Sequence, residues 1–293
     1  MRIAVLDIGG TAIKFGIWEK GALDNCGERE YCAKLGTQEL LGQMREILRE
    51  NRPFDRIGIS TAGLINSDKG VVMMASNIVG YSGTDLRKIL GGEFNVPVFV
   101  ENDVNCAAIA EAVYGAGQSY DSFICLAYGT GIGGAIIKDR QVLHRGANFA
   151  AGEMGHMITH AEDKLAGDVR SGCYEMYAST TALVKLAQKY DETLTSGRKI
   201  FAKLDSDENL RSILDKWIVE VMVGLAGLIH TFDPPCVVLG GGIMAQKYII
   251  DKLCDLKADY IMPTYCGVVF KPAQLGNYTG LLGAGYLAAT MVL

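Results

Sequence analysis

The sequence predicts an α/β protein that is built from two related domains. Its 293 residues are more than a single domain of ordinary size needs. Residues 2–18 and residues 122–138 both have the pattern of a strand, a glycine-rich turn and a second strand, which indicates two related halves. Helical spacing alternates with strand-like runs elsewhere. We expect domains at residues 1–117 and 118–277, with a C-terminal helix at about residues 278–293 that packs back on the first domain.

The remaining elements follow from the spacing of apolar residues. Short apolar runs predict strands at residues 2–8, 12–18, 56–60, 97–100, 122–127, 135–138 and 236–239. Helical spacing predicts helices at residues 38–49 and 84–91, a helix capped by Asp103 that ends at about Tyr114, a mostly helical stretch at 174–232, and a helix from near Gln246.

The composition narrows the class of protein. Hydrophobic residues make up 49% and charged residues 21%, which is typical of a folded globular protein. The net charge of −5, without a Lys/Arg cluster, predicts no nucleic acid and no membrane as partner. No export signal is recognisable, so we expect a cytoplasmic location, and the apolar stretch 278–293 is too short to span a bilayer. The eight cysteines are then expected to be reduced thiols or metal ligands rather than a disulfide framework, and four of them are predicted to lie in the core: Cys106, Cys125, Cys236 and Cys266.

The first glycine turn carries the groups that a nucleotide phosphate requires. Asp7 ends a strand, Gly9 and Gly10 form the turn, and a hydroxyl and an amine follow at Thr11 and Lys14. Glycines let backbone N–H groups approach phosphate oxygens, while the lysine can offset charge. The carboxylate of Asp7 can hold Mg²⁺ directly or through water. The spacing of a Walker A loop is absent, and an ordinary hairpin turn is the alternative for this stretch alone.

Two more glycine turns stand at strand ends. Residues 129–134 match G-x-G-x-x-G, but the chain continues as a strand, which excludes the dinucleotide-binding fingerprint. Residues 240–242 lie between a strand and a helix, where bare backbone can receive a ligand ring; close backbone packing is the alternative. The candidate nucleotide-binding residues here are Gly129, Thr130, Gly131, Gly133, Gly240, Gly241 and Gly242.

Three glycine turns at strand ends, the first with an acidic residue, fit the divided nucleotide site of actin-like ATPases. The chain also carries six motifs in the order and approximate spacing of a known family. These motifs are residues 7–14, 101–103, 129–134, 152–156, 172–175 and 240–242. On these residues the chain resembles the ROK sugar kinases, a family named after repressors, open reading frames and kinases, over nearly its whole length.

The resemblance implies an α/β fold of the two-domain actin-like ATPase (ribonuclease H-like) kind with an interdomain cleft. It also implies ATP-dependent phosphorylation of a sugar hydroxyl, at O6 of a hexose or β-glucoside, with ATP and Mg²⁺ as cofactors and Asp7 at the metal. Domain closure would exclude water, which otherwise competes as the phosphoryl acceptor. A homodimer is expected from the resemblance alone.

Phosphoryl transfer to an alcohol needs a carboxylate within reach of the hydroxyl. Asp103 is the candidate base, because the resemblance places the family's base at this Asn-Asp pair; a helix cap is the alternative. The resemblance also implies sugar contacts by Asn102, Glu153, His156 and Glu175. The alternatives are solvated surface acids for the two glutamates and a satisfied polar side chain for the histidine.

Two stretches depart from the family pattern. Many ROK proteins bind a structural zinc through one histidine and the three cysteines of C-x-C-G-x-x-G-C, whereas residues 166–173 retain only Cys173 to accompany His156. Two ligands do not complete a tetrahedral site, so we predict no structural zinc. Residues 60–66 correspond to a loop of the sugar pocket, but Ala62 stands where many relatives have proline.

The substrate stays open among several sugars. The zinc-free pattern resembles the subgroup that includes β-glucoside kinases, but a fructokinase or an N-acetylhexosamine kinase is an alternative, because pocket loops decide among such substrates. A non-catalytic sugar-sensing or sugar-binding ROK protein is the alternative from another class, which Asp103 and the glycine turns disfavour. A DNA-binding regulator is disfavoured because the first strand begins at Arg2.

Overall fold

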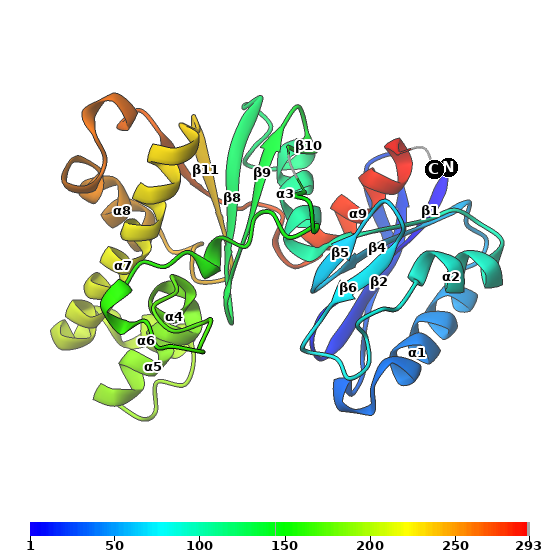
Figure 1. Cartoon of the computed structure of the whole chain (residues 1–293), viewed down its shortest axis with the longest axis horizontal. Helices are drawn as coiled ribbons and strands as arrows, with labels where there is room; N and C mark the ends of the chain where they lie inside the picture. The colour runs from blue at the N-terminus through cyan, green and yellow to red at the C-terminus, as the bar shows by residue number, and fades with distance from the viewer. Residues whose placement is uncertain (144, 292–293) are drawn as a thin grey trace. The chain divides into compact units, whose positions relative to one another are not determined.

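The computed structural model describes residues 1–143 and 145–291, which group into two units (Figure 1). Unit 1 consists of Met1–Gly115, Arg140–Ala151 and the chain from Leu275 onward. Unit 2 consists of Ala116–Asp139 and Gly152–Gln274. Each unit has its own sheet and its own hydrophobic core.

The sheet of unit 1 has the strand order β3-β2-β1-β4-β7. Its strands are β1 (Arg2–Ile8), β2 (Ala12–Glu19), β3 (Ala22–Glu30), β4 (Arg56–Thr61) and β7 (Val98–Asn102). The first three strands are antiparallel, while β4 and β7 run parallel to β1. A separate hairpin is formed by β5 (Leu64–Asn66) and β6 (Val71–Met74). The sequence did not predict β3 because this edge strand is largely exposed and lacks an apolar face.

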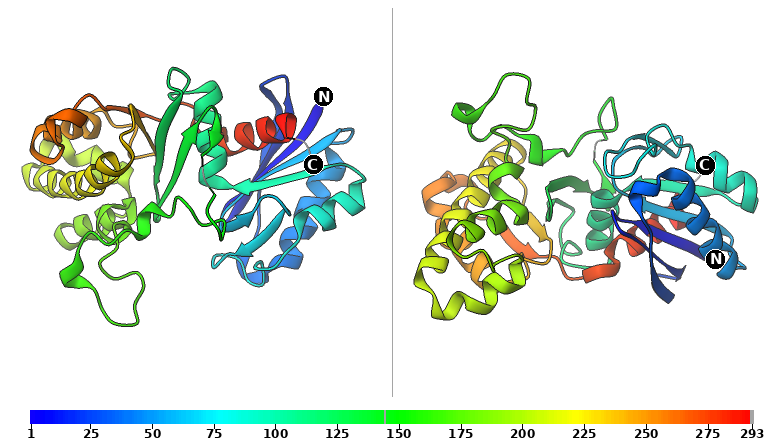
Figure 2. Two further views of the ribbon diagram at one scale, coloured as in Figure 1. Left: turned by 45° about the horizontal axis from the view of Figure 1, so that its top comes forward. Right: turned by 90° about the horizontal axis from the view of Figure 1, so that it is seen from below.

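Helices cover both faces of this sheet (Figures 1 and 2). They are α1 (Thr37–Glu50), α2 (Leu86–Phe94), α3 (Asp103–Tyr114) and α9 (Thr279–Thr290). Along β1, Ala4, Leu6 and Ile8 belong to the core with α1 and α2, whereas Ile3 and Val5 pack with Leu281 of α9. This period of two is what a strand buried on both faces requires. Of the C-terminal helix expected at 278–293, the last two positions lie outside the described residues.

Unit 2 repeats the topology of unit 1. Its strands β8 (Ser122–Tyr128) and β9 (Ile132–Lys138) form an antiparallel hairpin. The strands β11 (Cys236–Gly240) and β12 (Val269–Pro272) continue the sheet from β8 in parallel. A hairpin followed by two parallel strands therefore occurs in both units, which confirms the internal repeat predicted from the sequence. The short strand β10 (Gln141–Val142) lies in the segment that groups with unit 1.

The helices of unit 2 form one large core with its sheet. They are α4 (Glu175–Ala178), α5 (Thr180–Tyr190), α6 (Gly197–Lys203), α7 (Glu208–Phe232) and α8 (Lys247–Tyr260). Ile124, Leu126 and Tyr128 of β8 pack in this core with Trp217 of α7. Short 3₁₀ helices stand at Ala33–Leu35, Met154–His156, Ala161–Asp163, Leu204–Ser206, Pro263–Tyr265 and Gly276–Tyr278.

Three of the four cysteines expected in the core are buried, namely Cys106, Cys125 and Cys236. Cys266 is only half-buried, because it follows a short 3₁₀ helix rather than lying in a strand or a long helix. Among the described residues, no helix has the length and apolar character needed to cross a membrane.

Candidate nucleotide and sugar sites

The first glycine turn of unit 1 holds a carboxylate beside exposed backbone. Asp7 lies opposite Lys14 in the β1–β2 pair, and Ser60 Oγ donates to Asp7 Oδ1 at 2.6 Å. Burial raises the pKa of Asp7, while the hydrogen bond from Ser60 and the charge of Lys14 oppose that rise. A Cβ added to Gly280, at the start of α9, would lie 2.6 Å from the Asp7 carboxyl carbon. The helix end thus leaves room for the carboxylate only because residue 280 is a glycine.

Two hydrogen bonds at Gly9 stabilise the conformation of the turn. The Gly9 N–H donates to the Ala12 carbonyl at 3.1 Å, and the Tyr31 hydroxyl donates to the Gly9 carbonyl at 2.6 Å. Burial raises the pKa of Tyr31 to about 12, so this hydroxyl keeps its proton and remains a donor at neutral pH. Gly9, Gly10 and Thr11 are exposed, and they are therefore accessible to a ligand.

The second glycine turn, in unit 2, is shorter than the sequence predicted. The strand β9 begins at Ile132 instead of residue 135, so Gly133 lies in the strand and pairs with Ala127. The turn comprises residues 129–131, where the Gly129 N–H donates to the Gly131 carbonyl at 2.9 Å. The hydrogen-bonded ladder of the hairpin continues through the glycines, which carry no side chain to oppose it.

The third glycine turn shows two different uses of glycine. Gly241 has φ +98°, and a Cβ there would lie 2.1 Å from the Tyr128 carbonyl oxygen. Gly242 is exposed, and a Cβ there would meet no atom within 4 Å. Close backbone packing, which was the alternative to ligand binding for this turn, therefore explains the glycine at 241. At Gly242 the absence of a side chain leaves open space instead.

A large open cavity of about 730 Å³ lies at the second and third turns of unit 2. Its lining includes Gly129 and Thr130 from one turn, and Gly242 from the other. Helices α5 and α6 and the chain between them supply further lining residues, among them Thr180, Thr181, Lys185, Gln188, Thr195, Ser196 and Arg198. The volume suits a ligand of nucleotide size. Sequence reasoning missed the α5 and α6 residues, because no motif marks them.

Three of the expected sugar-binding side chains gather in unit 2. His156 Nδ1 lies 3.6 Å from Glu153 Oε2. Burial raises the pKa of Glu153, the charge of His156 opposes that rise, and the neighbouring charge of Glu175 adds to it. Glu175 also pairs with Arg170, whose Nη2 lies 2.9 Å from Glu175 Oε1. The sequence did not single out Arg170. The cluster offers two carboxylates and an imidazole, which are suitable partners for sugar hydroxyls.

The expected base lies in unit 1, at the start of α3. The N-cap of this helix is Asn102 rather than Asp103, since the Asn102 side chain accepts from the N–H groups of Val104 and Asn105. The cap therefore lies one residue earlier than the sequence predicted, which was Asp103. Asp103 is instead the first helical residue, and its Oδ1 accepts from the Val104 N–H and from Asn102 Nδ2, both at 2.9 Å. These two hydrogen bonds help to orient its carboxylate.

Asn102 uses its whole amide within the protein. Besides accepting the two helix N–H groups, it donates to Asp103 Oδ1 and to the Gly63 carbonyl. An amide has two donors and two acceptor positions, and all are engaged. Direct sugar contact by Asn102, as expected from the sequence, would require one of these bonds to be replaced. The bond to Gly63 connects the Asn-Asp pair to the loop at residues 60–66.

A buried ion pair lies directly before this pair of residues. Glu101 is 3% exposed, and its Oε1 accepts from the Asn102 N–H at 2.9 Å and from Asn105 Nδ2 at 3.0 Å. Its Oε2 accepts from Arg145 Nε at 2.9 Å. The pair joins the end of β7, and through Asn105 the first turn of α3, to the segment Arg140–Ala151, and the guanidinium compensates the charge of the buried carboxylate.

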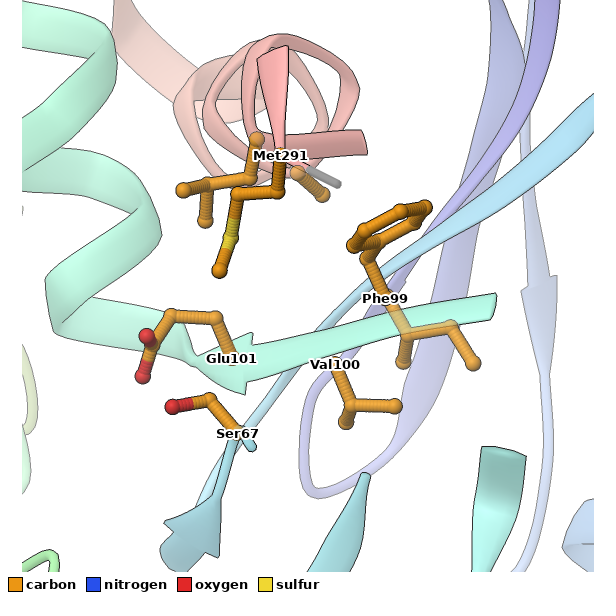
Figure 3. Close-up of a pocket in the computed structure, with 8 residues that line it drawn as sticks. Ser67, Phe99, Val100, Glu101 and Met291 are labelled. Carbon is orange, nitrogen blue, oxygen red and sulfur yellow. The ribbon is translucent and has the colours of Figure 1, made fainter. Parts of the chain in front are cut away.

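A small cavity beside Glu101 is not a ligand site. Figure 3 shows the Glu101 carboxylate and the Ser67 hydroxyl on one side of it, with Phe99, Val100 and Met291 lining the rest. Its volume is about 10 Å³, which is the size of a single water. A sugar or a nucleotide cannot enter.

The segment that carries zinc ligands in many ROK proteins is held here by other contacts. Cys173 Sγ donates to the carbonyls of His156 and Val169 at 3.4 and 3.2 Å. His160 stacks on Tyr177 with 3.7 Å between ring centroids, and its Nε2 lies 3.5 Å from Glu220 Oε2. Within the described ranges, no group of three His, Cys, Asp or Glu side chains could hold a metal ion. The absence of a structural zinc stays a prediction.

That prediction is testable by chelation. Incubation with EDTA or 1,10-phenanthroline is expected to leave the melting temperature unchanged, because His156 and Cys173 alone do not complete a tetrahedral zinc site, and hydrogen bonds and ring stacking hold this segment. Differential scanning calorimetry before and after dialysis measures the effect. A lowered melting temperature together with release of one zinc per chain would contradict the prediction.

Two α/β units of matching topology, each with a glycine turn in its first hairpin, define the class as an actin-like ATPase fold. A profile of the ROK family matches residues 3–291, and the chain belongs to this family. A β-glucoside kinase from Listeria innocua is 34% identical over 294 residues, which cover 98% of this chain and 97% of that protein. Both the family and the fold class expected from the sequence are thereby confirmed.

Solved structures agree with this assignment. A ROK hexokinase from Thermus thermophilus superposes with a TM-score of 0.85 at 30% identity, covering 99% of this chain and 98% of that chain. A ROK glucokinase from Streptomyces griseus, in complex with glucose and AMPPNP, has a TM-score of 0.84 at 26% identity, covering 99% of this chain and 100% of that one.

Proposed function

We propose that this chain is an ATP-dependent sugar kinase with Asp103 as its general base. The observation that carries the proposal is the orientation of the Asp103 carboxylate by Asn102 Nδ2 and the Val104 N–H. The sugar hydroxyl oxygen forms a bond to the γ-phosphorus while the bond from that phosphorus to the bridging oxygen of ADP breaks. The hydroxyl proton passes to Asp103. The names of its relatives, β-glucoside kinase and glucokinase, support this reaction class.

The nucleotide is proposed to use the glycine turns. The cavity of about 730 Å³ in unit 2 would hold the nucleoside, and the Gly129–Gly131 turn would present backbone N–H groups to the phosphates. Gly9, Gly10 and Thr11 of unit 1 would contact phosphate in the same way, and Lys14 would offset charge. The complex of one relative with glucose and AMPPNP supports the choice of ATP.

Asp7 is the proposed partner of Mg²⁺. The fit rests on a carboxylate that accepts from Ser60, lies opposite Lys14, and occupies the space that a Cβ at Gly280 would fill. Oxygen ligands are those that Mg²⁺ prefers, and the ion often keeps its waters. When bound, the metal would neutralise charge on the ATP phosphates. Ser60 fixes the orientation in which Asp7 would meet it.

The sugar is proposed to contact Glu153, His156 and Glu175. Two carboxylates can each accept from sugar hydroxyls, and the imidazole can donate or accept. We propose a β-glucoside or a hexose, phosphorylated at O6. The β-glucoside kinases among the relatives support the first choice, and the glucokinases support the second. Asn102 then acts mainly by orienting Asp103.

An ADP-release assay tests the activity and identifies the substrate. Purified protein with MgATP is offered glucose, fructose, mannose, N-acetylhexosamines, cellobiose and salicin. Turnover with one class establishes the kinase and names its substrate, and NMR of the product identifies the phosphorylated oxygen. If no sugar of the panel causes ADP release, while calorimetry still detects sugar binding, the non-catalytic sugar-binding alternative would be favoured.

The raised pKa of Glu153 gives a prediction about pH. The Glu153 side chain is 47% exposed, and its partial burial disfavours the ionised carboxyl, so the folded chain loses some stability as the pH rises from the unfolded to the folded pKa, and the loss is complete above both values. Glu153→Gln is therefore expected to raise the melting temperature at pH 7, and to have no such effect well below about pH 4. It should also raise KM for the sugar by about tenfold or more, because a hydrogen bond to a charged group is lost.

Thermal denaturation and initial-rate kinetics at several pH values measure both effects. An Asp68→Asn variant is the control, because Asp68 lies outside the cluster and its side chain is not assigned to either site. A melting temperature that is lower in Glu153→Gln than in the wild type at pH 7 would contradict the prediction.

The homodimer and the cytoplasmic location also remain proposals. Analytical ultracentrifugation tests the first, since a dimer has twice the mass of the 31.6 kDa chain. Fractionation of cells that express the tagged protein tests the second.

A further inference from the structure

The carboxylate of Glu175 lies directly against the second glycine turn. Its Oε2 is 3.4 Å from the Ile132 nitrogen, and a Cβ added to Gly131 would lie 2.4 Å from that same oxygen. The glycine at 131 therefore leaves space for a carboxylate, in a turn where the motif alone suggests only phosphate binding. The Glu175 side chain is 11% exposed, so solvent screens its charge poorly.

This arrangement creates an electrostatic problem for a nucleotide. A triphosphate at the Gly129–Gly131 turn brings negative charge close to a carboxylate, and two like charges at short range repel. Any kinase that uses this turn must offset the charge of Glu175. Glu153 is a second neighbouring carboxylate, whose pKa already reflects the charge of Glu175.

Arg170 supplies the compensating charge. Its Nη2 donates to Glu175 Oε1 at 2.9 Å, on the carboxylate oxygen other than the one against the turn. Its backbone is held as well, since the Arg170 N–H donates to Asp168 Oδ1 at 2.9 Å and the Arg170 carbonyl accepts from the Cys173 N–H at 3.1 Å. These backbone hydrogen bonds stabilise the turn that carries Arg170, and the turn positions the guanidinium beside Glu175.

We propose that Arg170 is a positioning residue that acts through Glu175: it neutralises and holds the carboxylate so that the adjoining glycine turn can accept the phosphates of ATP. The inference rests on the proposed nucleotide site and extends it to a side chain outside the glycine motifs. Arg170 is 60% exposed, so an ordinary surface ion pair, which contributes little, is the competing explanation. The two differ in whether nucleotide affinity depends on the charge of Glu175.

Calorimetric titration with AMPPNP and Mg²⁺, in the absence of sugar, tests the proposal on the full chain. Arg170→Met is expected to weaken AMPPNP binding by about tenfold, because an uncompensated carboxylate then faces the phosphates. Arg170→Lys should stay within about threefold of the wild type, since the positive charge is retained. The double variant Arg170→Met/Glu175→Gln should recover to within about threefold of Glu175→Gln alone. A purely structural role of Arg170 would not produce this recovery.

A matched control removes a similarly exposed arginine elsewhere. Arg49 is 62% exposed and pairs with Glu93 at 2.7 Å, and Arg49→Met should leave AMPPNP affinity unchanged. If Arg170→Met bound AMPPNP with wild-type affinity, or if the double variant bound it as weakly as Arg170→Met, the inference would be overturned. Neither result would contradict the proposed nucleotide site. A wild-type protein that does not bind AMPPNP would overturn the proposed nucleotide site and this inference together.

Discussion

Asp103→Asn is expected to lower kcat by about 10²- to 10⁴-fold, the range that general base catalysis contributes. Asparagine has nearly the same shape, and its side-chain oxygen can still accept from the Val104 N–H and from Asn102 Nδ2. It cannot take a proton from the sugar hydroxyl. The melting temperature and the affinities for AMPPNP and for sugar should therefore stay close to wild-type values, while turnover in the ADP-release assay is lost.

Asp85→Asn is the matched control for this experiment. Asp85 is also an aspartate at the start of a helix of unit 1, where its side chain accepts from the Lys88 N–H at 2.8 Å. Its replacement should leave kcat unchanged, because Asp85 has no proposed part in the reaction. If Asp103→Asn kept more than about one tenth of the wild-type kcat, Asp103 would not be the base.

Glycine turns and apolar strands were the features that the sequence predicted best. The hairpins at β1–β2 and β8–β9 follow from apolar runs separated by glycines, and both are present. The edge strand β3, the short hairpin β5–β6 and the strand β12 were not predicted. The first is largely exposed, and the others have only three or four residues, too few to establish a period of two.

In the candidate site, the sequence predicted residues that belong to local motifs but not the contacts between residues far apart in the chain. The motifs located Asp7, Asp103 and Glu175, but they did not indicate which partners orient these carboxylates. Ser60 lies 53 positions from Asp7, and Arg145 lies 44 positions from Glu101. Such pairs form only when distant segments meet in the fold. Even the helix cap was assigned one residue too late, because Asn and Asp are both good N-caps and the sequence alone does not select between them.

Glu101 and Arg145 support the other large prediction, which concerns stability. Arg145→Met is expected to lower the free energy of unfolding by about 3 kcal/mol, because it leaves a buried carboxylate without its cation. Glu101 is 3% exposed and the Arg145 side chain is 27% exposed, so water cannot fully replace the guanidinium. Urea denaturation followed by circular dichroism measures the loss. Arg49→Met, which removes an exposed ion pair, should cost less than about 1 kcal/mol.

A double variant separates the charge from the packing of the side chains. Glu101→Gln/Arg145→Met replaces the lone carboxylate by a neutral amide whose oxygen can still accept from the Asn102 N–H and from Asn105 Nδ2. It should therefore be more stable than Arg145→Met alone, although it contains one more substitution. Additive losses would show instead that the two side chains act independently. Because Glu101 also fixes the turn that carries Asp103, the variant that loses most stability should lose kcat as well, and the double variant should recover part of both.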